Sequence, residues 1–186
     1  LNLTGEAAVA DAVLRCWHST RAERVSEYRQ RYGLSLDSIE MAVLVQHLVP
    51  ADSSAVIFSA NPVTDNRDEV TINASWGLGE SIVGGTVSPD TFTIDKSDLS
   101  VTESKISDKE VMTVLVADGT KEVPVPRFMR SQPTLSEEQL SAMAQLAMRL
   151  EEFMGWPVDV ETAYCGDELY RLQCRLITTL IDPDEK

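Results

Sequence analysis

The chain opens with a helical pattern of apolar residues. From Thr4, which suits an N-cap, to Arg31, apolar positions recur every three or four residues, and Gly33 follows as a stop. This pattern predicts one long amphipathic helix, or two helices with a break near Ser19. We expect residues 1–35 to form an N-terminal helical segment.

Short apolar runs separated by turn residues then predict a sheet. Residues 41–49 form an apolar run interrupted only by Gln46 and His47, which is typical of a strand buried on both faces. Further strands are predicted at residues 55–59, 70–75, 91–95 and 111–116. We expect residues 40–118 to form a sheet-rich part, and residues 119–135, which carry prolines among mixed charges, to form an exposed connection.

A second helical pattern begins after the prolines. Ser136 and Gln139 have the spacing of a capping box, and Gly155 stands where the helix should end. The predicted core face of this helix comprises Leu140, Met143, Leu146, Ala147, Leu150 and Phe153. Together with the segment that follows, it forms the last expected part of a single domain, residues 136–178.

Two alternating runs after Gly155, residues 158–164 and 169–177, predict a β-hairpin. With a three-residue loop at positions 166–168, every opposed pair of residue numbers has the same sum. Because strand side chains alternate between faces, one face then carries four polar residues, called here the polar quartet: Asp159, Glu161, Gln173 and Arg175.

The quartet has the composition of a magnesium and phosphate site. Glu161 faces Gln173 in this register, and opposed side chains begin about 5 Å apart, so a carboxylate and an amide oxygen can converge on one cation. Magnesium prefers oxygen ligands and keeps positions for water and phosphate. Arg175, opposite Asp159, could hold a phosphate beside the metal. The alternative is a solvated hairpin face with an Asp159–Arg175 pair that contributes little stability.

Composition narrows the function classes. At 186 residues and 43% hydrophobic content, the chain can form one globular domain. A net charge of −14 disfavours nucleic acid as a partner, and no apolar run or leader pattern predicts a membrane segment. Three cysteines, an odd number without CxxC spacing, favour a reducing cytoplasm over a disulfide framework.

Several segments, read in order, carry a family resemblance. These are CWHS with a downstream EYR, AVLVQHLV, FSANPVT, ASWGLGESIVGGTVSPD, GWPVDVE and LQCRLIT. The order resembles the ATP-binding domain of phosphoenolpyruvate synthase, pyruvate phosphate dikinase and rifampicin phosphotransferase, from about Ala8 to Thr178. The resemblance implies an α+β fold, the second lobe of an ATP-grasp domain, with a mostly antiparallel sheet and flanking helices.

The resemblance also implies roles for particular residues. It implies that Glu161 and Gln173 bind the metal, with Asp159 as an auxiliary acid, and that Arg175 is a catalytic residue that contacts a phosphate. Gln46 would line the adenine end of the cleft. The Gly77-Leu78-Gly79-Glu80 segment matches the GLGE turn of the family, which would place Glu80 near the ribose. The resemblance implies Mg²⁺ as the cofactor and ATP as the substrate.

In that family, ATP phosphorylates a histidine on a separate swivelling domain, which passes the group to pyruvate or to the antibiotic. Neither His18 nor His47 matches the position of that histidine. The first ATP-grasp lobe and the swivelling domain are expected as partners outside this chain, so we expect the isolated chain to show little turnover. The alternatives are a rifampicin phosphotransferase fragment, or a non-catalytic nucleotide-binding or scaffold module. Thr162, where the family usually has tryptophan, favours the scaffold module.

Overall fold

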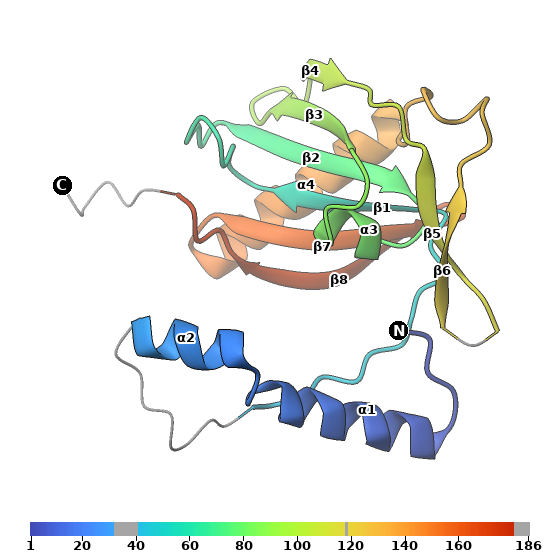
Figure 1. Ribbon diagram of the computed structural model, residues 1–186. Helices are drawn as coiled ribbons and strands as arrows, with labels where there is room; N and C mark the ends of the chain where they lie inside the picture. Colours follow the sequence, from blue (N-terminus) through green and yellow to red (C-terminus); the bar gives the residue numbers. More distant parts are fainter. Residues whose placement is uncertain (32–40, 118, 181–186) are drawn as a thin grey trace. The chain divides into compact units, whose positions relative to one another are not determined.

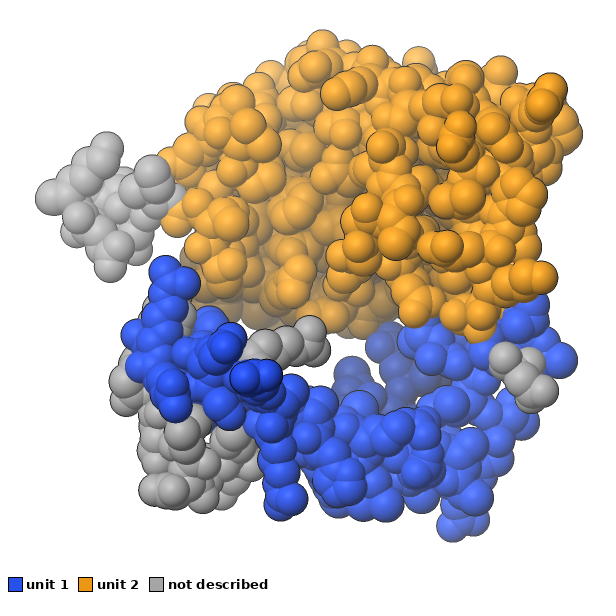
Figure 2. Space-filling view, viewed as in Figure 1, with its two compact units in different colours: residues 1–48, 116–119 blue, residues 49–115, 120–186 orange. Residues whose placement is uncertain are grey.

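The computed structural model describes residues 1–31, 41–117 and 119–180. The chain divides into two compact units, which Figure 2 distinguishes by colour. The first unit comprises residues 1–48 and 116–119, and the second comprises residues 49–115 and 120–186. No helix of the described residues is long and apolar enough to cross a membrane.

The first unit contains two helices, α1 (Glu6–Ser19) and α2 (Glu23–Arg31), so the alternative with a break near Ser19 is confirmed. Helix α1 begins after Gly5, whose φ of 90° only glycine adopts readily, and no side chain caps it; Thr4 is therefore not the N-cap. None of its residues is buried, so its apolar stripe lies at a surface of this unit. Gly33 and the end of the expected helical segment lie outside the described residues.

The strand expected at residues 41–49 is absent: residues 41–50 form neither helix nor strand, and Gln46 is exposed rather than buried. This prediction was wrong because an apolar, β-branched run favours an extended chain but becomes a strand only where a neighbouring strand accepts its backbone hydrogen bonds.

The second unit contains a six-stranded antiparallel sheet in the order β4-β3-β2-β1-β7-β8 (Figure 1). Its strands are β1 (Ser53–Phe58), β2 (Glu69–Trp76), β3 (Asp90–Asp95), β4 (Val101–Lys105), β7 (Val158–Cys165) and β8 (Glu168–Leu176). A separate hairpin pairs β5 (Val111–Leu115) with β6 (Thr120–Pro124), and a short helix α3 spans Glu80–Val83. The α+β, mostly antiparallel architecture expected from the sequence is confirmed.

Helix α4 (Glu137–Met154) crosses one face of this sheet and closes the core (Figure 1). The capping box is present, since the Ser136 hydroxyl accepts from the Gln139 backbone and the Gln139 side chain accepts from the Ser136 backbone. Gly155 ends the helix in the left-handed conformation, at φ 78°. The buried residues of α4 are Leu140, Met143, Ala144 and Ala147. They pack with alternate residues of the central strands, such as Ile57, Ile72 and Val160.

Three further features, two strands and one side chain, differ from the sequence-based expectations. Residues 120–124 of the expected connection form β6, because the pairing partner β5 precedes them directly in the chain. The edge strand β4 was not predicted, since all of its residues are exposed and polar residues dominate it. Phe153, expected in the core face of α4, is 84% exposed because it follows the last buried turn of the helix.

A buried ion pair fixes the loops that lead into and out of the β5–β6 hairpin. Asp90 and Lys109 are both fully buried, with Nζ and Oδ1 2.6 Å apart. The second carboxylate oxygen, Oδ2, accepts from the backbone and hydroxyl of Thr134 at 2.9 and 2.6 Å. Every oxygen of this carboxylate is thus hydrogen-bonded, as a buried charge requires.

Candidate functional site

The polar quartet lies on the face of the sheet opposite α4. On β7, Val158 and Val160 point into the core beneath α4, so the alternating residues Asp159 and Glu161 point the other way. Glu161 is the Cα partner of Val56 on one side and of Gln173 on the other. The structure therefore brings the predicted acids, amide and guanidinium together on one face, along two adjacent rows of the sheet.

The register of the β7–β8 hairpin differs from the expected one near the turn. Cys165 pairs with Glu168, which leaves a two-residue loop of Gly166 and Asp167, so the three-residue loop was wrong. Gly166 has a φ of 58°, which a tight hairpin turn favours. The register shifts by one between Glu161 and Thr162, where β8 has one residue more than β7. The extra residue is Leu172.

This β-bulge is the reason that the predicted pairs are nonetheless present. Beyond it, Glu161 pairs with Gln173 and Asp159 with Arg175, as the sequence predicted. Without the bulge, a two-residue turn would set Glu161 opposite Leu172 and turn Gln173 and Arg175 toward the α4 side. One structural irregularity thus compensates for the shorter turn.

The side-chain oxygen atoms of Glu161 and Gln173 are not hydrogen-bonded to any described residue. Glu161 is partly exposed and Gln173 exposed, and neither side chain has a hydrogen bond or ion pair within the described part of the chain. A carboxylate and an amide oxygen are donors of the kind that magnesium prefers. Among the described residues, no group of three His, Cys, Asp or Glu side chains could form a metal site of another kind.

Asp159 and Arg175 are joined directly. Oδ2 of Asp159 accepts from Nε of Arg175 at 2.8 Å and lies 2.8 Å from Nη2. The two side chains differ in exposure: that of Asp159 is 8% exposed and that of Arg175 55%. The guanidinium group thus reaches the surface while its carboxylate partner stays beneath it.

The Gly77–Glu80 turn packs at the beginning of β1, on the same face as the quartet. Gly77 donates to the Asp52 carbonyl at 2.8 Å, and its own carbonyl accepts from the Ser54 hydroxyl at 2.7 Å. Ser54 alternates with Ala55 and so lies on the quartet side of β1. A Cβ at Gly77 would lie 2.3 Å from the Thr113 carbonyl oxygen, so only glycine fits against β5.

Glu80 begins α3, directly after this turn. Its Oε2 accepts from the Thr120 hydroxyl at the start of β6, at 3.1 Å. Sequence reasoning missed both Thr120 and Ser54 as supports of the turn, since they lie 40 and 23 residues away from their partners. Gln46 belongs to the first unit, whereas Glu80 and the quartet belong to the second.

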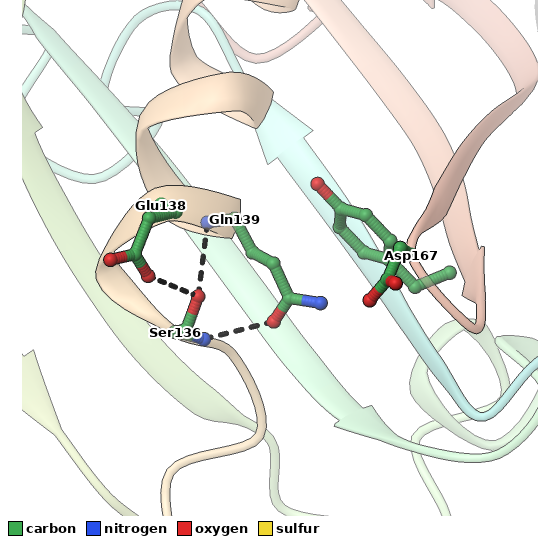
Figure 3. Close-up of a pocket in the computed structure, with 5 residues that line it drawn as sticks. Ser136, Glu138, Gln139 and Asp167 are labelled. Carbon is green, nitrogen blue, oxygen red and sulfur yellow. Dashed lines mark hydrogen bonds between the residues drawn. The ribbon is translucent and has the colours of Figure 1, made fainter.

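An open pocket of about 370 Å³ lies at the beginning of α4 (Figure 3). Its lining consists of Ser136, Glu138, Gln139, Tyr164 and Asp167. Figure 3 shows Ser136 hydrogen-bonded to Gln139 and to the carboxylate of Glu138. Hydrogen bonds from its own backbone and from the Ser136 hydroxyl hold the pKa of Glu138 below its usual 4.5. The pocket thus belongs to the helix cap, and Tyr164 places it on the α4 side of the sheet.

The fold and the quartet together define a class: an α+β lobe of the ATP-grasp type, with charged and amide side chains gathered on the sheet face that its helix leaves uncovered. The whole chain, residues 1–186, matches the family described as "Pyruvate phosphate dikinase, AMP/ATP-binding domain". The chain belongs to this family.

Relatives with this domain include named enzymes. A "Probable phosphoenolpyruvate synthase" of Pyrococcus horikoshii is 39% identical over 97% of this chain and 23% of its own length. A "Probable phosphoenolpyruvate synthase" of Methanocaldococcus jannaschii is 39% identical over 97% of the chain and 15% of its own length. A "Rifampicin phosphotransferase" of Streptomyces sviceus is 37% identical over the whole chain and 21% of its own length. The chain thus spans between a seventh and a quarter of these relatives.

Proposed function

We propose that this chain is the ATP- and magnesium-binding lobe of a dikinase-type phosphotransferase, in which ATP phosphorylates a histidine on another domain. The observation that carries the proposal is the direct opposition of Glu161 and Gln173 on the sheet face that α4 leaves open. Membership of an AMP/ATP-binding family supports ATP as the bound nucleotide. The names of the relatives support phosphoryl transfer to pyruvate or a related acceptor.

Within this proposal, Glu161 and Gln173 hold magnesium, and Arg175 contacts a phosphate of the nucleotide. Bound magnesium would neutralise phosphate charge, which matters because the chain itself carries a net charge of −14. Glu80, in the second unit, lines the ribose end of the site. The adenine role of Gln46, in the first unit, stays a prediction of the family resemblance. Asp159 is an auxiliary acid of the same site.

We further propose that the lobe works with a first ATP-grasp lobe and a swivelling histidine domain, in a cytoplasmic enzyme. The share of the relatives that the chain spans supports additional domains. Phosphoryl transfer requires charge around the moving group from several sides, so this lobe alone is expected to show little turnover. The free thiols of Cys16, Cys165 and Cys174 support a reducing compartment.

The test is ATP binding and phosphoryl transfer in the full-length protein that carries this chain. Glu161→Ala and Gln173→Ala should each abolish the magnesium-dependent rise in melting temperature that ATP produces, and reduce transfer at least tenfold, with the melting temperature of the free protein nearly unchanged. Glu103→Ala, on the exposed edge strand β4, is the matched carboxylate control. Unchanged binding in both site variants would refute the proposal.

A second candidate is a nucleotide-binding or scaffold module without turnover. The observation that favours it is Thr162, where the family usually has tryptophan beside the metal-binding acid. In this case, the full-length protein shifts its melting temperature with ATP and magnesium but forms no phosphohistidine. A rifampicin phosphotransferase, by contrast, would transfer phosphate to the antibiotic in the same assay.

A further inference from the structure

The carboxylate of Asp159 is committed to one neighbour. A single oxygen, Oδ2, accepts from Nε of Arg175 and also lies 2.8 Å from Nη2, so two corners of the guanidinium group converge on it. An arginine side chain has five N–H donors, and this contact uses two of them. Three donors of Arg175 thus remain for another partner, on a side chain that is more than half exposed.

The other oxygen of Asp159 is closed off. Oδ1 is buried and has no hydrogen-bond partner, and the residue as a whole is 7% exposed. Magnesium keeps a nearly octahedral shell at about 2 Å and retains several waters, so it needs oxygens that open to solvent. Glu161 and Gln173 are at least partly open to solvent. Asp159 does not fit a metal ligand on this geometry.

We propose that Asp159 is a positioning residue: it holds the guanidinium group of Arg175 ready for a phosphate oxygen of the nucleotide and does not bind the metal. This inference rests on the proposed function. A flexible arginine must otherwise lose its side-chain freedom when the phosphate binds, and a fixed one has lost it already. The adjacent row of the sheet, with Glu161 and Gln173, supplies the metal ligands.

The two roles for Asp159 predict different kinetics in the full-length protein. Asp159→Asn should raise the Kd and KM for ATP about 5- to 20-fold and leave the magnesium concentration at half-maximal binding unchanged. In an Arg175→Lys background, the same substitution should have no further effect, because it acts only through the guanidinium group. Glu103→Gln, on β4, serves as the control for loss of a carboxylate elsewhere on the sheet.

Opposite results would overturn the proposal. If Asp159 binds the metal, Asp159→Asn raises the magnesium requirement, and its effect multiplies that of Arg175→Lys. Melting curves of each variant identify those that fail to fold. If Asp159→Asn fails to fold, Asp159→Glu replaces it as the test. Because this variant keeps the charge, it should retain part of the ATP affinity if Arg175 is the partner of the carboxylate.

A third measurement does not depend on nucleotide. Hydrogen exchange of the Arg175 Nε–H, followed by nitrogen-15 NMR without ATP, should be slowed in the wild-type protein at least tenfold relative to Asp159→Asn. Equal exchange in the two proteins contradicts the positioning role. If the wild-type protein binds no ATP while this exchange is slowed, the proposed function fails and the Asp159–Arg175 contact stands on its own.

Discussion

Glu161 stands directly opposite Gln173, although the turn that joins their strands is one residue too short for a regular ladder to pair them. The additional residue in β8, Leu172, makes up the difference. The position of the amide beside the acid therefore depends on a local irregularity some distance from the turn, and single-residue deletions can test this dependence.

Deleting Leu172 should preserve the site. Without this residue, the ladder can run regularly from the turn to the end of β8 and keep every pair that the structure shows. We expect ATP binding with magnesium to be retained within about threefold, with a loss of roughly 1–2 kcal/mol of stability from the partly buried leucine. The measurements are calorimetric titration with ATP and urea unfolding.

Deleting Cys174 is the matched control for this experiment. It makes Gln173 and Arg175 neighbours in sequence, and neighbours on a strand point to opposite faces. No register then presents both side chains beside Glu161, so ATP binding should be lost. If the two deletions behave alike, the bulge does not set the register of the site.

Gly77→Ala should destabilise the protein more than Gly85→Ala. Both glycines have positive φ, 75° and 69°, so alanine at either position costs about 1–2 kcal/mol of backbone strain. Only Gly77 lacks space, because a Cβ there would stand 2.3 Å from the Thr113 carbonyl oxygen, and this should add roughly 1–3 kcal/mol. Denaturant unfolding of the two variants measures the difference in stability. Equal losses would show that β5 moves away and makes room for the added Cβ.

Lys109→Met should be among the most damaging single substitutions. It leaves the fully buried Asp90 carboxylate without its cation, which costs about 3–5 kcal/mol in buried pairs. Lys96→Met is the control, because the Lys96–Glu151 pair has the same 2.6 Å separation but is partly exposed, and its loss should cost only about 1 kcal/mol. Similar losses in urea unfolding would contradict the importance of burial at Asp90.

Stability should fall at alkaline pH through Cys174. Burial raises the pKa of this thiol above its usual 9.0, against a smaller opposing effect of Arg171. As pH rises past that value, the unfolded chain releases the proton first, so the contribution of this group to stability is complete below pH 9 and declines above it. Cys174→Ala should flatten the decline in melting temperature above about pH 9. An unchanged slope would assign the decline to other groups.

Helix α4 and most of the strands of the main sheet could be predicted because their signals are local. A capping box, a stop glycine and a repeating apolar face act within a few residues, and alternation along β7 alone sets Asp159 and Glu161 on one face. The family resemblance added ligand roles to residues that this alternation had already grouped.

Several of the wrong predictions depend on contacts that local sequence does not specify. Residues 41–49 have the composition of a strand but pair with no strand of the described residues, and β6 formed in an expected connection because β5 was there to pair with it. The Gly77–Glu80 turn depends on Ser54, Thr113 and Thr120, none of which is near it in the chain. Backbone hydrogen bonds between strands are made with whichever segment folds alongside, so local composition does not specify them.

Residue order alone was sufficient for the capped helix and the grouping of four polar residues on one hairpin face, because 3.6-residue and two-residue periodicities are properties of the backbone. The α+β class followed from the family resemblance carried by the ordered motifs. Tertiary structure decided which face α4 covers, where the bulge falls and that Asp159 is buried beneath Arg175. These depend on packing between segments far apart in the chain, where the free energy of one contact is set by all of its neighbours.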